Sequence, residues 1–105
     1  MNTEQITMSK ALIGAVLKDN LSEVLKLLRK GADPNFVEDV CLITPLHFAV
    51  QNGSLKIIEA LFAAGGCITA VTEEGESPLD VATICKQKEV SELLNRILLS
   101  SVINH

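Results

Sequence analysis

Apolar residues recur along the chain in short bursts at helical spacing, separated by polar turns and glycines. Spacings of three and four place side chains on one face of an α-helix. The first burst consists of Met8, Leu12, Ala15 and Val16, and the second of Val24, Leu25, Leu27 and Leu28. Gly31 follows the second burst, as glycine does after many helices. These bursts predict two short amphipathic helices, which cannot bury their apolar faces without a neighbouring unit.

The same order of elements returns further along the chain. Residues 45–51 predict a helix, Asn52-Gly53 a turn, and residues 54–64 a second helix that ends before Gly65. The apolar positions of that second helix are Leu55, Ile57, Ile58, Leu61 and Phe62. We expect both Phe48 and Phe62 to lie in the core.

The segment Thr44–Ala49 has the composition of a helix start. Thr44 can accept a hydrogen bond from a backbone N–H as a cap, and Pro45 suits the first helical position. Leu46 and Ala49 then share the face that enters the core. The segment returns 33 residues later as Ser77-Pro78-Leu79-Asp80-Val81-Ala82, so the chain has an internal repeat.

The motif T-P-L-H-x-A and a period of about 33 residues are the signature of ankyrin repeats, and the chain resembles that family. The resemblance implies an all-α solenoid of three helix-turn-helix repeats with protruding β-hairpin-like fingers. The implied division is a flexible N-terminus at residues 1–7, a degenerate capping repeat at 8–38, a second repeat at 39–71, and a third at 72–105 with an extended C-terminal helix. The fingers are residues 31–43 and 65–76.

His47 sits where the family uses histidine to tie neighbouring turns by hydrogen bonds. A catalytic role would need a second histidine, a cysteine or a carboxylate arranged with it, and the sequence offers no such constellation. Asp80 replaces this histidine in the third repeat, which weakens the expected tie there. Its carboxylate near a helix start interacts favourably with the helix dipole instead.

The fingers depart from the family pattern. In the first finger, Leu42 stands where the tip glycine is expected, among the apolar residues Val37, Val40, Cys41 and Ile43. This tip either folds over the first repeat as packing or is an exposed apolar contact. The second finger has an acidic tip, which is either an ordinary solvated tip or a contact for basic residues around an apolar anchor of a partner. The acidic residues are Glu73, Glu74 and Glu76.

Composition narrows the classes of function. The chain of 105 residues is 48% apolar and 21% charged, which fits one folded domain. A net charge of −4 with scattered Lys and Arg argues against a general nucleic-acid or anionic-membrane binder. No apolar stretch reaches the ~18–20 residues of a membrane span, and no secretory signal is visible. Three cysteines without zinc or redox spacing fit a cytoplasmic protein, or a nuclear one.

The favoured function is a non-enzymatic protein–protein interaction module that needs no metal or other cofactor. There is no phosphate-binding loop and no H-E-x-x-H motif, and Cys41 has no basic neighbour that would make its thiol reactive. By alignment with the variable positions of the family, the residues expected to contact a partner protein are Val40, Cys41, Ile43, Gln51, Asn52, Glu73, Glu74, Glu76, Ile84 and Cys85.

The apolar C-terminus leaves alternatives open. The apolar face at Val90, Leu93, Leu94, Ile97 and Leu98 continues through Leu99, Val102 and Ile103, whereas terminal repeats normally have a polar outer face. A longer helix packed on the stack, a self-association surface, or a boundary with further repeats would each explain it. The alternative functions are therefore a self-associating structural unit and a segment of a larger adaptor or scaffold.

Overall fold

The computed structural model describes residues 2–103 of the chain, with side chains described through residue 100. The side chains of Val102 and Ile103, predicted to extend the C-terminal apolar face, lie outside the described residues. The helices are α1 (Thr3–Leu17), α2 (Leu21–Arg29), α3 (Pro45–Asn52), α4 (Leu55–Ala63), α5 (Pro78–Ile84) and α6 (Lys88–Ile103). No strand occurs within residues 2–103.

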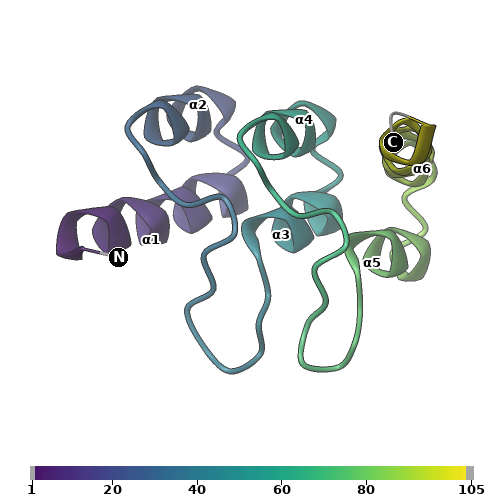
Figure 1. Cartoon of the computed structure of the whole chain (residues 1–105), viewed down its shortest axis with the longest axis horizontal. Helices are drawn as coiled ribbons and strands as arrows, with labels where there is room; N and C mark the ends of the chain where they lie inside the picture. Colours follow the sequence, from purple (N-terminus) through teal and green to yellow (C-terminus); the bar gives the residue numbers. More distant parts are fainter. Residues whose placement is uncertain (1, 104–105) are drawn as a thin grey trace.

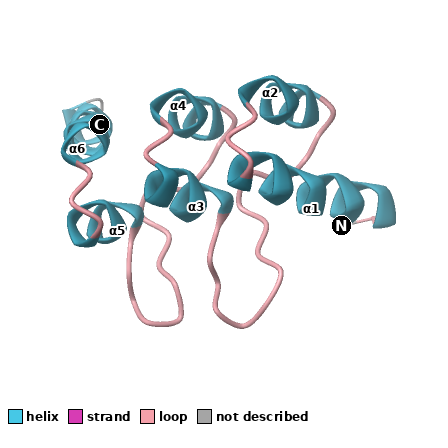
Figure 2. Cartoon of the chain, turned by 180° about the vertical axis from the view of Figure 1, so that it is seen from behind, coloured by secondary structure: helices cyan, strands magenta, loops and turns pink. Residues whose placement is uncertain are grey.

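The helices form two rows, and two long loops project from one of them. Helices α1, α3 and α5 lie side by side as an inner row, and α2, α4 and α6 lie over them as an outer row (Figure 1). Both fingers protrude from the inner row on the side away from the outer helices (Figure 2). The predicted all-α solenoid of helix pairs is therefore confirmed. Each finger projects as a loop, and the turn of the second is closed by a hydrogen bond from Thr72 N–H to the Glu76 carbonyl (3.0 Å).

One apolar core runs through the three helix pairs. Each pair contributes residues at the spacings predicted from the sequence, so neighbouring pairs cover one another's apolar faces. The largest fully buried apolar side chains are Leu12, Val16, Val24, Leu46, Val50, Ile57, Ile58, Leu61, Val90 and Leu94.

The two repeated motifs start helices as the sequence predicts. The Thr44 hydroxyl accepts a hydrogen bond from the backbone N–H of His47, and the Ser77 hydroxyl accepts one from Asp80. In return, the Asp80 carboxylate accepts hydrogen bonds from the N–H and the hydroxyl of Ser77. These bonds hold the pKa of Asp80 below its usual value. Because each cap uses the orphan N–H groups of a first helical turn, both inner helices begin at fixed residues.

The N-terminal segment differs from the prediction. Residues 3–7, expected to be flexible, are the first turns of α1. Asn2 caps this helix by accepting a hydrogen bond from the backbone N–H of Gln5 (2.7 Å). The side chain of Gln5 donates to the carbonyl of Gly31 (3.1 Å), which links the helix start to the first finger. A local cap and one long-range hydrogen bond therefore extend the helix where the apolar pattern predicted none.

Two apolar residues lie further out than predicted. Phe62, expected in the core, is 41% exposed, and Leu25 in α2 is also exposed. The buried face of α4 is set by Ile58 and Leu61, three positions apart. Phe62 follows Leu61 directly and so lies about 100° further round the helix, at the edge of that face. The prediction of Phe62 as a core residue was wrong.

The fingers have equivalent turns although their residues differ. Leu42 has φ of +58° and Gly75, 33 positions later, has φ of +82°. Leu42 therefore occupies the left-handed tip position that glycine fills in the second finger. A side chain with a Cβ carries a steric cost of ~1–2 kcal/mol in this conformation. Val40, Cys41 and Leu42 are all exposed, so the tip is open to solvent. The alternative in which the tip packs over the first repeat is therefore not what the structure shows.

We expect Leu42→Gly to stabilise the chain by ~0.5–1 kcal/mol, because glycine removes the left-handed strain but adds entropy to the unfolded chain. The matched variant Leu42→Ala keeps the Cβ and should show no gain. Urea denaturation of the two variants measures the difference. An alanine variant as stable as the glycine variant would mean that backbone strain at the tip is negligible.

Candidate functional site

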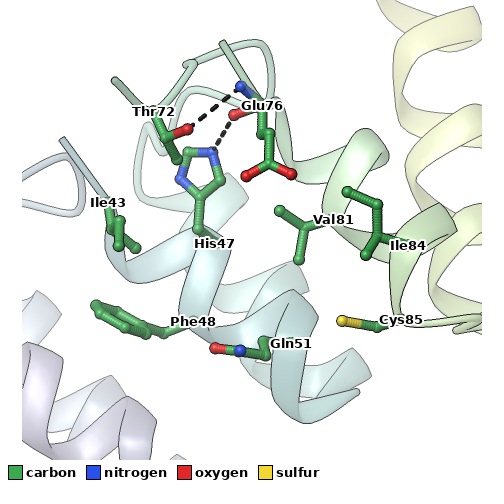
Figure 3. A pocket seen from close by; sticks show the side chains of 9 residues that line it. All are labelled: Ile43, His47, Phe48, Gln51, Thr72, Glu76, Val81, Ile84 and Cys85. Atoms are coloured by element: carbon green, nitrogen blue, oxygen red, sulfur yellow. Dashed lines mark hydrogen bonds between the residues drawn. The ribbon is translucent and has the colours of Figure 1, made fainter. Parts of the chain in front are cut away.

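The inner helices and the second finger enclose a groove, which we call the α3–α5 groove. It has a volume of about 210 Å³ and is lined by Ile43, His47, Phe48, Gln51, Thr72, Glu76, Val81, Ile84 and Cys85. Apolar side chains from both helices form its walls, and Glu76 extends over one end with its carboxylate directed toward Val81 (Figure 3). Ile84 is 63% exposed although it is large and apolar.

Two further hollows continue the groove along the same face. A hollow of about 220 Å³ between α1 and α3 is lined by Ile13, Leu17, Glu38, Asp39, Ile43 and Phe48. Another of about 160 Å³ lies between the finger tips and is lined by Cys41, Ile43, Thr72, Glu73, Glu74 and Glu76. Ile43 lines all three, so the hollows and the groove form one connected concave surface.

His47 fixes the second finger above the groove. Its Nε2–H donates to the carbonyl oxygen of Glu76 (2.9 Å), and its Nδ1 accepts from the backbone N–H of Thr44 (3.2 Å). The Thr44 hydroxyl lies 2.8 Å from the same nitrogen. With one ring nitrogen donating and the other accepting, the imidazole is neutral, and burial lowers its pKa. The predicted structural role of His47 is confirmed: it ties the α3 start to the next finger.

Asn35 makes the equivalent link at the finger bases. Its side-chain oxygen accepts from the backbone N–H of Cys67 (2.8 Å), and its amide donates to the carbonyl of Gly65 (3.0 Å). At the tips, the N–H of Glu73 donates to the carbonyl of Cys41 (2.9 Å). Because the two fingers are joined at base and tip, the surface between them is preorganised.

The concave surface is acidic. Residues 31–54 and 65–85, which include both fingers, α3 and α5, contain seven carboxylates and no Lys or Arg. All the basic side chains come from α1, the outer helices and the residues that follow helices. The charge of the chain is therefore divided between an acidic inner face and a mixed outer face.

This acidity affects the thiol at the first finger tip. The carboxylate of Asp39 is the main cause that raises the pKa of the exposed Cys41 thiol, and the carboxylate of Glu73 raises it further. A thiol with a raised pKa stays protonated at neutral pH and is a weak nucleophile. The structure thus supports the sequence argument against a reactive Cys41.

The structure brings together most of the residues predicted to contact a partner. Gln51, Ile84 and Cys85 line the α3–α5 groove, and Ile43 and Glu76 line both it and the hollow between the finger tips. Cys41, Glu73 and Glu74 line that hollow as well. Val40 lies outside these cavities at the finger tip and is 78% exposed. The Asn52 amide instead donates to the carbonyl of Val16 (3.1 Å), which links adjacent turns of the stack.

Sequence reasoning missed several residues of this surface. Phe48, assigned to the core, is half-buried and lines both the groove and the hollow beside α1. Val81 occupies the same repeat position 33 residues later and lines the groove too. Leu17, which lines the hollow beside α1, is exposed. The sequence held a signal for them, because each lies next to a buried residue of an inner helix. Phe48 and Val81 directly precede Ala49 and Ala82, and Leu17 directly follows Val16.

The described residues offer no metal site and no membrane-spanning element. Within residues 2–103, no group of three or more His, Cys, Asp or Glu side chains is placed to hold a metal ion. None of the helices in that part of the chain is both long and apolar enough to cross a bilayer.

A family model described as ankyrin repeats in three copies matches residues 12–100. The chain belongs to the ankyrin-repeat family. In this ankyrin-repeat chain, the Thr44–His47–Glu76 link thus joins one repeat to the finger of the next. The ankyrin repeat is a non-catalytic interaction fold that mediates protein–protein contacts, and this holds for the domain as a class.

Several curated ankyrin-repeat relatives are similar to the chain. It is 34% identical over 87 residues to the ARF GTPase-activating protein Git of Drosophila melanogaster, covering 83% of this chain and 12% of that protein. It is 39% identical over 75 residues to the putative ankyrin repeat protein FPV216 of Fowlpox virus, covering 70% of this chain and 25% of that protein. It is 35% identical over 68 residues to the cyclin-dependent kinase 4 inhibitor B of Bos taurus, covering 65% of this chain and 52% of that protein. The chain thus spans only part of these relatives.

Proposed function

We propose that this chain is a non-enzymatic interaction module that binds a partner protein through its fingers and the concave surface of its inner helices. The observation that carries the proposal is the α3–α5 groove, where apolar side chains remain open to solvent beneath a finger held by His47. Exposed apolar side chains gathered in a preorganised hollow mark interaction sites on soluble proteins. The bovine kinase inhibitor, whose name describes action on another protein, supports the same class of function.

The composition of the surface favours moderate affinity. The chain has no Trp or Tyr, and these two residues supply many of the hot spots of tight interfaces. The contacts come instead from aliphatic side chains, Phe48 and carboxylates. We propose that binding takes place in the cytoplasm or the nucleus, where the exposed cysteines at 41, 67 and 85 would stay reduced.

We expect the combined change of Glu73, Glu74 and Glu76 to Lys to weaken partner binding by ~10–100-fold without unfolding the chain. Each exposed charge contributes up to ~1 kcal/mol to such a contact, and reversal replaces attraction by repulsion. Affinity capture with the intact chain from its native cells, followed by mass spectrometry, identifies a partner. Titration calorimetry with the purified partner then gives the change in affinity.

The matched control changes Glu59, Glu89 and Glu92 to Lys, because these exposed residues lie on α4 and α6 and carry the same charge. The control variant should bind within ~3-fold of the native chain. Equal losses in both variants would assign the effect to net charge, and no loss in the finger variant would place the interface elsewhere.

Self-association through α6 is a second hypothesis, and one observation favours it. Leu99 is 61% exposed on the last turns of α6, beyond the buried residues Val90 and Leu94. Sedimentation velocity over a wide range of protein concentrations distinguishes this hypothesis from the first. A sedimentation coefficient that corresponds to the monomer even at high concentration would contradict self-association and leave the partner-binding proposal intact.

A further inference from the structure

We infer that the α3–α5 groove receives an arginine side chain from a basic segment of the partner, with the guanidinium on the Glu76 carboxylate and the aliphatic stem over Val81 and Ile84. This inference rests on the proposed partner binding and names the chemistry that the partner must present at one place. It extends the proposal from a general surface to a pairing between two side chains.

Glu76 has a held backbone and a carboxylate that can accept hydrogen bonds from a ligand. Its backbone is held at both ends, since its carbonyl accepts from His47 (2.9 Å) and its N–H donates to the Thr72 hydroxyl (3.3 Å). Its carboxylate points into the groove toward Val81 (Figure 3). Among the described residues, no hydrogen bond or ion pair engages that carboxylate, although the residue is half-buried. The backbone of Glu76 is therefore held in place while the acceptor positions of its carboxylate remain open.

The surroundings select a cation with a long apolar stem. No Lys or Arg lies in the fingers, α3 or α5, so none of these elements supplies a cation for Glu76. Beneath the carboxylate, Val81 and Ile84 present aliphatic surface on the wall of the groove. Arginine and lysine place their methylene groups on such surface while the charged end reaches a polar rim. Carboxylates at Glu73 and Glu74 nearby add attraction for a segment with further basic residues.

Arginine suits the site better than lysine. The guanidinium is planar, can form two parallel hydrogen bonds with one carboxylate, and is more weakly hydrated than an ammonium group. A half-buried carboxylate beside apolar walls favours the cation that loses less hydration free energy when it leaves water, and that cation is the guanidinium. The groove, at about 210 Å³, is also smaller than the ~300–1,000 Å³ typical of small-molecule sites, and its size fits one inserted side chain.

Peptide selection on the intact chain tests the pairing. A random library of 12-residue peptides displayed on phage is selected against the immobilised protein, and the peptide that binds best is synthesised. We expect the selected sequences to share an arginine next to an apolar residue. Replacing that arginine by citrulline, which is neutral and of similar shape, should weaken binding at least about fivefold in calorimetry.

The citrulline replacement is then repeated on the variant Glu76→Gln, which keeps the shape of the side chain and removes its charge. The two changes together form a double-mutant cycle. In this variant, citrulline should weaken binding by less than about twofold, because the pairing is already lost. The matched control is Glu59→Gln on the exposed surface of α4, which should keep the full effect of citrulline.

Failure to select peptides, peptides without an arginine, or an equal effect of citrulline in the native chain and Glu76→Gln would each overturn the inference. The variant Ile84→Asp separates it from the general proposal. Peptides that need Ile84 but no arginine would leave partner binding at the groove intact, and peptides indifferent to both Ile84 and Glu76 would contradict both proposals for this surface.

Discussion

Leu46→Ala is expected to lower the free energy of unfolding by ~2–5 kcal/mol. The Leu46 side chain is only 1% exposed and belongs to the single core that runs through the stack. Truncation removes buried apolar surface and leaves a cavity between neighbouring repeats that packed helices cannot close. A small domain has only ~5–15 kcal/mol of stability in total, so the loss would be a large fraction of it. Urea denaturation followed by circular dichroism measures the change.

Leu99→Ala is the matched control for this prediction. It makes the same chemical change within a helix, but Leu99 is mostly exposed and leaves no internal cavity. The control should change stability by less than ~0.5–1 kcal/mol. A loss under ~1 kcal/mol for Leu46→Ala, or equal losses for both variants, would mean that Leu46 does not support the core.

The fold could be predicted from the sequence because the strongest signals are local and repeated. Thr44-Pro45 and Ser77-Pro78 each specify a cap and a first helical residue, and both act as predicted. The 33-residue offset between them also aligns Leu42 with Gly75, which explains why the two tips share a left-handed turn despite different residues. A period therefore carried structural information even where residue type did not.

The errors have physical causes that a periodic pattern does not contain. The helical start of α1 depends on the Asn2 cap and on the bond between Gln5 and Gly31, which join polar residues. The exposure of Phe62 depends on where the edge of the α4 face lies, and one helical step is enough to leave the core.

The candidate site could be predicted only in part. Alignment with variable positions found Ile84 and Glu76 but gave no reason to pair them. Their proximity depends on the His47 bond to Glu76, which spans 29 residues of sequence and positions the second finger above α5. The position of Glu76 at the groove depends on that long-range contact together with the local hydrogen bonds between Thr72 and Glu76.

The His47 bond leads to the second large effect, which we expect from His47→Ala. Truncation leaves the buried Thr44 N–H without its partner and the Glu76 carbonyl with only the hydrogen bond from Thr72 N–H, and a buried polar group that loses its hydrogen bond costs ~1–3 kcal/mol. We therefore expect a loss of ~2–4 kcal/mol in urea denaturation at neutral pH. The corresponding change in the third repeat, Asp80→Ala, removes only an exposed cap and should cost ~1 kcal/mol.

The pH dependence of stability tests whether His47 acts as a neutral hydrogen-bonding group. Burial lowers its pKa in the folded chain, whereas the unfolded chain takes up a proton near the ordinary value of ~6.5. Below that pH the unfolded state binds more protons than the folded state, so the free energy of unfolding should fall as the pH drops from ~6.5 toward the folded pKa. Above pH ~7 His47 is neutral in both states, and stability should no longer depend on pH through this group. The pKa of Asp80 is also lowered, so its contribution to stability is lost only at still lower pH, as the pH falls below the ordinary value of 3.8. In urea denaturation between about pH 5 and 7.5, the variant His47→Gln should lose this slope, and an unchanged slope would show that another group titrates.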